Sequence, residues 1–135
     1  MKYYAVIDTN VIVSSMLKHN SAPGMIIDLV ISNVIVPLLN DEILMEYKEV
    51  LTRSKFGFGS SNVSDFLDNI KERSIFLERE KTIQEFIDKD DIVFYEIVMK
   101  ARHNKEAYLI TGNIKHYPLE SYIVTPREML DIIEI

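Results

Sequence analysis

The chain has 135 residues, 47% of them hydrophobic, 27% charged and none of them cysteine, a composition that excludes disorder, disulfides, thiolate metal sites and cysteine nucleophiles. Its net charge is −6, whereas most nucleic-acid-binding domains are basic. The negative charge does not exclude a nucleic-acid substrate if bound cations neutralise a cluster of acidic residues. We expect one folded domain over residues 1–135, in the cytoplasm and without a membrane span.

Helices and strands are predicted to alternate along the chain. The strands are continuous apolar runs, which is typical of a parallel sheet that is covered on both faces. In chain order, we expect a strand at 3–7, helices at 11–18 and 25–31, a strand at 35–39, helices at 41–53 and 63–73, a weaker strand at 75–77, a helix at 91–104, strands at 107–111 and 122–125, and a helix at 127–133. This order predicts a three-layer α/β fold around a parallel sheet of about five strands.

The stretch 55–62 is the most loop-like part of the sequence. It holds two of the four glycines, and Ser61 or Asn62 is expected to cap the helix that follows. We interpret it as a loop inside the domain and not as a linker.

Asp8 directly follows the first predicted strand. Ligands of open parallel sheets bind beyond the carboxyl ends of the strands, so a ligand-binding carboxylate is expected at this position. Asp is also a common helix cap, and a cap for the helix that follows explains Asp8 equally well. The residue alone leaves both interpretations open.

Glu46 lies in the middle of the predicted helix 41–53. Helical spacing puts it beside Ile43 and Val50, which belong to the apolar stripe of that helix. Glu46 therefore borders the buried face, although an exposed position is the more frequent fate of a glutamate.

Three acidic residues, Asp88, Asp90 and Asp91, gather where the next helix is predicted to begin. Capping and the helix dipole account for one acidic residue in a first turn. Three exceed that need, and carboxylates that lie close together repel one another unless a cation is present. A bound metal ion is thus the second interpretation of this cluster.

The strand 107–111 ends at Thr111 and leads into Gly112, Asn113, Lys115 and His116. A hydroxyl, an amide, a cation and an imidazole are thereby expected at the carboxyl edge of the sheet. Gly-Asn is also a common turn pair, so an ordinary turn after the strand explains the same residues.

The joint placement of these four groups is more informative than any one of them. All are expected at one end of one sheet, and carboxylate and amide oxygens select Mg²⁺ or Mn²⁺ over zinc. Because Mg²⁺ commonly combines one or two carboxylates with substrate phosphate, the pattern implies a substrate that carries phosphate.

The sequence also resembles the PIN domain family, in particular its bacterial branch of toxin components of toxin-antitoxin systems. The matching segments are VIDTNVIVSS (6–15), EILMEYKEVLTRSKF (42–56), DKDDIVFYEIVMKA (88–101), YLITGNIKHYP (108–118) and IVTPREML (123–130). They occur in the order of the family and span nearly the whole chain.

The resemblance implies a Rossmann-like PIN fold and a metal-dependent ribonuclease. Asp8, Glu46 and Asp91 match the acidic residues that bind Mg²⁺ or Mn²⁺ and catalyse hydrolysis of RNA. The fourth acidic position of the family falls on Asn113, which removes one negative charge and puts a second metal ion in doubt. The remaining candidates for supporting or substrate-contacting roles are Thr9, Asn10, Asp88, Asp90, Thr111, Asn113, Lys115 and His116.

The partner implied is an RNA substrate, single-stranded by preference. An antitoxin protein and a second copy of the chain are further partners that the resemblance leaves open.

Three alternatives to the nuclease function remain. A phosphatase of the haloacid dehalogenase type needs a second Asp at position 10, where this chain has Asn10. In a receiver-like phosphotransfer domain, the phosphoacceptor Asp is expected at the end of a middle strand, whereas Asn40 follows the strand 35–39 here. A non-catalytic RNA-binding or scaffold domain is the third, which Asn113 favours.

Overall fold

The computed structural model describes residues 1–82 and 89–135. Its elements, in chain order, are β1 (Tyr3–Ile7), α1 (Thr9–Leu17), α2 (Ala22–Ile31), β2 (Ile35–Leu39), α3 (Asp41–Leu51), α4 (Ser60–Arg73), β3 (Ile75–Phe76), the 3₁₀ turn η1 (Lys89–Asp91), α5 (Ile92–Ala101), β4 (Ala107–Ile110), the 3₁₀ turn η2 (Ile114–His116), β5 (Ile123–Val124) and α6 (Pro126–Ile133). The five predicted strands are therefore present, each within about two residues of its expected bounds.

The strands form one parallel sheet in the order β3-β2-β1-β4-β5. β1 is the central strand and pairs with β2 on one side and with β4 on the other, so that Ala5 lies between Pro37 and Tyr108. The predicted three-layer α/β fold with a parallel sheet of about five strands is confirmed.

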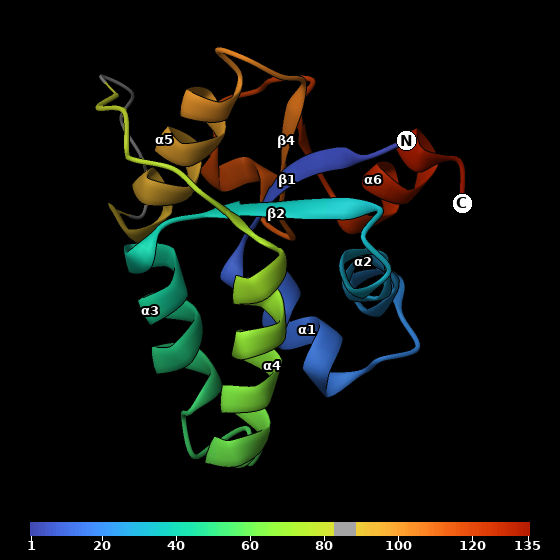
Figure 1. Cartoon of the computed structure of the whole chain (residues 1–135), viewed down its shortest axis with the longest axis vertical. Helices are drawn as coiled ribbons and strands as arrows, with labels where there is room; N and C mark the ends of the chain where they lie inside the picture. The colour runs from blue at the N-terminus through green and yellow to red at the C-terminus, as the bar shows by residue number, and fades with distance from the viewer. Residues whose placement is uncertain (83–88) are drawn as a thin grey trace.

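The chain reverses its direction across the sheet between β3 and β4, and this reversal distributes the helices over both faces. Right-handed crossovers place the helices of the β1–β2 and β2–β3 connections on one face and the helix of the β3–β4 connection on the other. Accordingly, α2 and α4 contact each other and β2, whereas α5 packs on β1, β2 and β4 (Figure 1).

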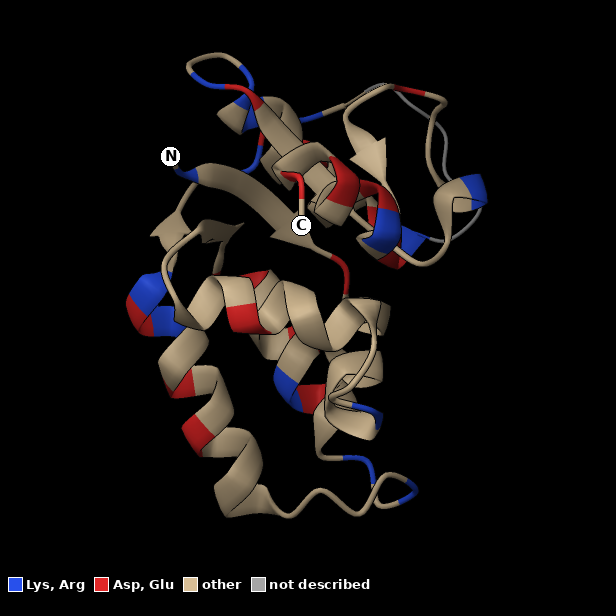
Figure 2. Cartoon of the chain, turned by 90° about the vertical axis from the view of Figure 1, so that its right-hand side faces the viewer, with Lys and Arg blue, Asp and Glu red and all other residues tan. Residues whose placement is uncertain are grey.

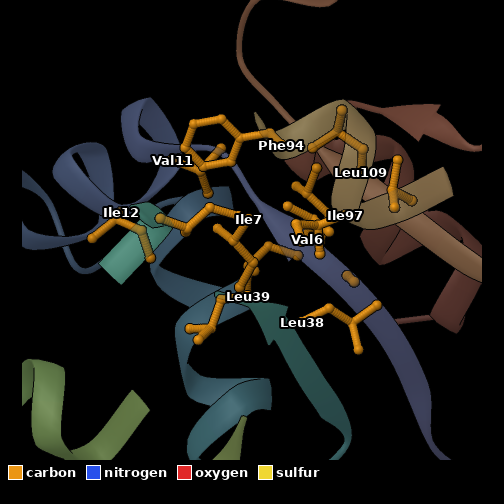
Figure 3. Packing of buried hydrophobic residues seen from close by; sticks show 14 of the residues in the cluster. Val6, Ile7, Val11, Ile12, Leu38, Leu39, Phe94, Ile97 and Leu109 are labelled. Atoms are coloured by element: carbon orange, nitrogen blue, oxygen red, sulfur yellow. The ribbon is translucent and has the colours of Figure 1, made fainter. Parts of the chain in front are cut away.

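The core surrounds the central strand. Val6 and Ile7 of β1 belong to it together with Phe94 and Ile97 of α5, Leu38 and Leu39 of β2 and Leu109 of β4, and all of these are almost completely buried (Figure 3). Tyr47 of α3 is also buried, and its hydroxyl donates to the backbone oxygen of Ile7. This bond ties the helix that carries Glu46 to the end of β1.

Two helices begin three residues earlier than predicted, because the residue before the helix, and not the apolar run, sets their first residue. The Ser21 side chain accepts a hydrogen bond from the Gly24 amide and starts α2 at Ala22, three residues before the expected start. The prediction that Ser61 or Asn62 caps α4 is wrong. α4 begins at Ser60 after Gly59, whose φ of 85° lets the chain turn into the helix without a side-chain cap.

None of the helices in the described ranges is long and apolar enough to cross a membrane.

We expect Gly24→Ala to destabilise the fold. A Cβ atom at Gly24 would lie 1.7 Å from the backbone oxygen of His19, so the turn between α1 and α2 would have to move. Overpacking of this kind costs about 1–3 kcal/mol of unfolding free energy, and thermal melting would measure the loss. Ser14→Ala, at an exposed position of α1, is the control. Equal melting temperatures of Gly24→Ala and wild type would contradict the expected clash.

Candidate functional site

The carboxyl ends of β1 and β4 lie side by side at the point where the topology switches direction. The crossover that leads into β2 lies on one face of the sheet, and the crossover that leads into β4 lies on the opposite face. A crevice at such a switch point is where open α/β sheets bind their ligands. Asp8 directly follows β1 and Thr111 directly follows β4, and both lie at this point.

Asp8 is only 5% exposed and is held by hydroxyl groups. Thr111 Oγ1 donates to Asp8 Oδ2 over 2.7 Å, and the Tyr117 hydroxyl donates to the same oxygen over 3.0 Å. Asp8 occupies the position before α1, yet its side chain makes no capping hydrogen bond to that helix. Capping therefore does not explain the side chain of Asp8. Burial raises the pKa of its carboxyl, and the hydrogen bonds from Thr111 and Tyr117 oppose this rise.

Glu46 reaches the same place from α3. Its side chain is half-buried, and Glu46 Oε2 accepts a hydrogen bond from the hydroxyl of Thr9, the residue that follows Asp8. Burial raises the pKa of Glu46, and the negative charges of Asp8, Asp90 and Asp91 raise it further. Glu46 thus lies within electrostatic reach of the other three acids.

Asp91 lies at the start of α5 and is paired with His116 from the loop after β4. His116 Nδ1 and Asp91 Oδ2 are 3.1 Å apart, and because a carboxylate offers only acceptors, the ring nitrogen donates. Asp91 makes no capping hydrogen bond with its side chain. Asp90 is exposed on η1, and Asp88 lies outside the described residues.

The loop after β4 closes the other side of the site. Asn10 Oδ1 accepts a hydrogen bond of 2.9 Å from the Gly112 amide, which joins the loops that follow β1 and β4. A Cβ at Gly112 would lie 3.0 Å from the same Asn10 oxygen, so glycine permits this close approach. Asn113 is exposed. Its backbone amide donates to Thr111 Oγ1, and its backbone oxygen accepts a hydrogen bond from the His116 amide.

Lys115 is exposed and lies beside a small open cavity. The cavity has a volume of about 300 Å³, and its lining includes Asn113, Lys115 and His116 as well as Thr125 at the start of α6. The cavity therefore places Lys115 and Asn113 beside His116, which pairs with Asp91, and Asn113 adds no charge there.

A second buried carboxylate, Glu96 of α5, was not identified from the sequence and differs from Asp8 in its partners. Arg79 Nε donates to Glu96 Oε1 over 2.6 Å, and the Thr82 amide donates to Oε2 over 2.8 Å. Arg79 also binds Glu42 of α3 over 2.7 Å. The charge of Glu96 is thus compensated by a guanidinium, which is the mark of a structural ion pair.

Asp8 has no such compensation from the groups that bond to it. The described groups that form hydrogen bonds with its carboxylate are hydroxyls, an amide side chain and a backbone amide, and all of them are neutral. Together with Glu46 and Asp91, it forms a group of oxygen donors of the kind that Mg²⁺ and Mn²⁺ prefer. By donor chemistry and local charge, these residues fit a divalent cation.

The described carboxylates of this site do not form a closed cluster of metal ligands. Across residues 1–82 and 89–135, no three carboxylate or imidazole side chains are close enough together to hold one metal ion jointly. The arrangement brings Asp8, Glu46 and Asp91 to one edge of the sheet and couples them through their charges. Elsewhere, acidic and basic residues are interspersed along the helices (Figure 2).

Tyr117 is the residue of this site that sequence reasoning missed. It is 7% exposed, and its hydroxyl binds the central carboxylate. The signal was present in the sequence, because Tyr117 directly follows His116 in the loop after β4. An aromatic residue there was not distinguished from an ordinary core residue.

Known proteins resemble the chain over most of its length. The PIN domain family matches residues 4–115, a range that includes Asp8, Glu46, Asp91 and Asn113. A protein of Methanocaldococcus jannaschii that is described as uncharacterized is 28% identical over 116 residues, which cover 84% of this chain and 72% of that protein. No solved structure matches the sequence significantly.

We expect Glu46→Gln to raise the stability of the protein at neutral pH. A carboxyl whose pKa is raised by folding contributes stability that is complete below its unfolded pKa and is lost as pH rises through the folded pKa. Glutamine removes that loss and can still accept the hydrogen bond from Thr9. The melting temperature of the variant should therefore exceed that of the wild type at pH 7, and the difference should shrink as the pH falls toward 4.

The control for this measurement is Glu72→Gln, at an exposed position of α4. An equal shift in both variants, or a shift that does not depend on pH, would contradict the electrostatic origin assigned to it.

Proposed function

This chain belongs to the PIN domain family, and we propose that it is a metal-dependent endoribonuclease with Asp8, Glu46 and Asp91 as its catalytic residues. Proteins of this family are typically metal-dependent nucleases. The observation that carries the proposal is the buried Asp8 carboxylate, whose hydrogen-bond partners among the described residues are neutral groups and whose charge raises the pKa of Glu46. We further propose that residues 1–135 act as one nuclease domain.

Asp8, Glu46 and Asp91 would hold Mg²⁺ or Mn²⁺. A divalent cation at this position would supply a more acidic water and neutralise charge on the phosphate. The roles of the chain's own groups follow from their surroundings. Glu46 is half-buried at the edge of the site, and we propose that its carboxylate accepts the proton of the attacking water. Thr9 fixes one oxygen of Glu46, so Oε1 is the atom expected to receive the proton.

The substrate is proposed to be RNA, single-stranded by preference. Lys115 is an exposed cation next to Asn113 and His116 at the edge of the site, where it can contact a neighbouring phosphate. Asn10 is engaged with the Gly112 amide, which supports a role in holding the loops rather than the substrate.

We also propose, on the resemblance of the five segments quoted above, that the protein is the toxin of a toxin-antitoxin pair in the cytoplasm. Expression of the chain should then arrest growth, and coexpression of a neighbouring reading frame should relieve the arrest. Growth that is equal for wild type and Asp8→Asn would count against this finer proposal.

A second candidate function is a non-catalytic RNA-binding or scaffold domain. Asn113 favours it, because the position that is often acidic in the family is here neutral and exposed. The two functions differ in whether RNA is cut, and the variants described next distinguish them.

We expect Asp8→Asn, Glu46→Gln and Asp91→Asn each to lower the rate of RNA cleavage by at least about 100-fold, since each removes a negative charge from the carboxylates that would hold the cation. Cleavage of a labelled single-stranded RNA in Mn²⁺ would be measured, with circular dichroism to verify the fold. Chelation of the metal should abolish the activity of the wild type.

The matched controls are Asp65→Asn and Glu72→Gln on the exposed side of α4, which remove the same kind of charge far from the site. Full activity in any two of the three site variants would overturn the assignment of the site. RNA binding without cleavage by the wild type would favour the scaffold function.

Asn113→Asp tests how many ions the site takes. If Asn113 accounts for the lack of a second ion, a carboxylate there should add one Mn²⁺ to the measured stoichiometry or tighten the first, because ligand charge is one determinant of affinity for hard cations. Calorimetric titration of both forms would measure this. Equal stoichiometry and equal affinity would show that position 113 lies outside the metal site.

A further inference from the structure

The loop after β4 donates hydrogen bonds to two of the three proposed catalytic carboxylates. Thr111 and Tyr117, at the two ends of the segment 111–117, both donate to Asp8 Oδ2. His116, from the same segment, donates to Asp91 Oδ2. One short stretch of chain therefore spans the site and contacts an acid that follows β1 and an acid that precedes α5.

The two donors to Asp8 are fixed by burial. Thr111 is completely buried, and Tyr117 is 7% exposed with its ring inside the core cluster. A carboxylate oxygen has two lone-pair positions, and both positions on Oδ2 can be satisfied by these hydroxyls. The orientation of the carboxylate is then determined by this pair of hydrogen bonds.

We propose that the segment 111–117 orients the metal-binding carboxylates instead of supplying a fourth one, with Tyr117 and His116 as positioning residues for Asp8 and Asp91. This inference rests on the proposed function. It assigns to Tyr117 a role in the site that its place in the core alone would not require, because a phenylalanine would fill the same volume.

A contact inside the segment 111–117 supports the same positioning role. Asn113, in the middle of the segment, contributes no carboxylate, and its backbone amide donates to Thr111 Oγ1 over 3.0 Å. Thr111 thus accepts from the backbone and donates to Asp8, so the turn itself helps to hold the hydroxyl. Partners that orient metal ligands in this way commonly change metal affinity or activity by about 10–100-fold when they are replaced.

The first test is Tyr117→Phe, which removes one hydroxyl and keeps the ring. Mn²⁺ affinity measured by calorimetry should weaken by about 10-fold, and kcat for RNA cleavage should fall while KM for RNA changes little. Tyr122→Phe is the matched control, because the Tyr122 hydroxyl donates to Met99 Sδ and not to a site residue. A purely structural role would lower the melting temperature without changing the Mn²⁺ affinity of the folded protein.

The second test keeps the inference falsifiable if Tyr117→Phe does not fold. The His116 side chain is 37% exposed, so substitution there should be tolerated. His116→Leu removes the donor to Asp91 and should weaken Mn²⁺ binding by about 10-fold, whereas His116→Asn keeps a nitrogen donor at a similar distance along the side chain and should recover most of that loss.

Mn²⁺ affinities of Tyr117→Phe and His116→Leu within twofold of the wild type would overturn this inference alone. A wild-type protein that neither binds Mn²⁺ nor cleaves RNA would overturn the proposed function as well. Weaker binding in both variants, with Tyr122→Phe unchanged, would support the inference.

Discussion

The burial of one carboxylate at the end of the central strand constrains much of the structure around it. Removing a charge from water costs free energy unless hydrogen-bond donors replace the solvent. Asp8 obtains its donors from the loop after β4, and that loop must therefore return across the end of the sheet. The helix α3 is fixed in turn, because Tyr47 binds the backbone of Ile7 and Glu46 binds the hydroxyl of Thr9.

Asp8 and Glu96, the two buried carboxylates of residues 1–82 and 89–135, differ in how their charge is compensated. Glu96 is neutralised by Arg79, which also joins α5 to Glu42 of α3. That ion pair stabilises the packing of α3, α5 and the segment before residue 83, and it leaves little negative electrostatic potential at Glu96. The negative potential at Asp8 is retained, because hydroxyl groups orient its carboxylate without cancelling its charge.

The fold was predictable because continuous apolar strands and alternating helices are properties of the sequence itself, and all five strands were found where the apolar runs occur. The starts of the helices were less predictable. Ser21 and Gly59 act through side-chain capping and backbone conformation, which lie outside the apolar pattern.

Helical spacing correctly placed Glu46 at the border of the buried face. Tyr117 could not be found in this way, since its role depends on a contact with Asp8, which is 109 residues away in the sequence.

Belonging to the PIN domain family argues against the phosphatase and receiver-like interpretations.

The contact between Asn10 and Gly112 restricts how this site can change during evolution. The two residues approach so closely that neither position can change freely while the other is kept. A larger residue at 112 would require a shorter one at 10, and the hydrogen bond would then be lost. Substitutions at two such positions are not additive, so these residues are expected to vary together among relatives, as one inherited pair.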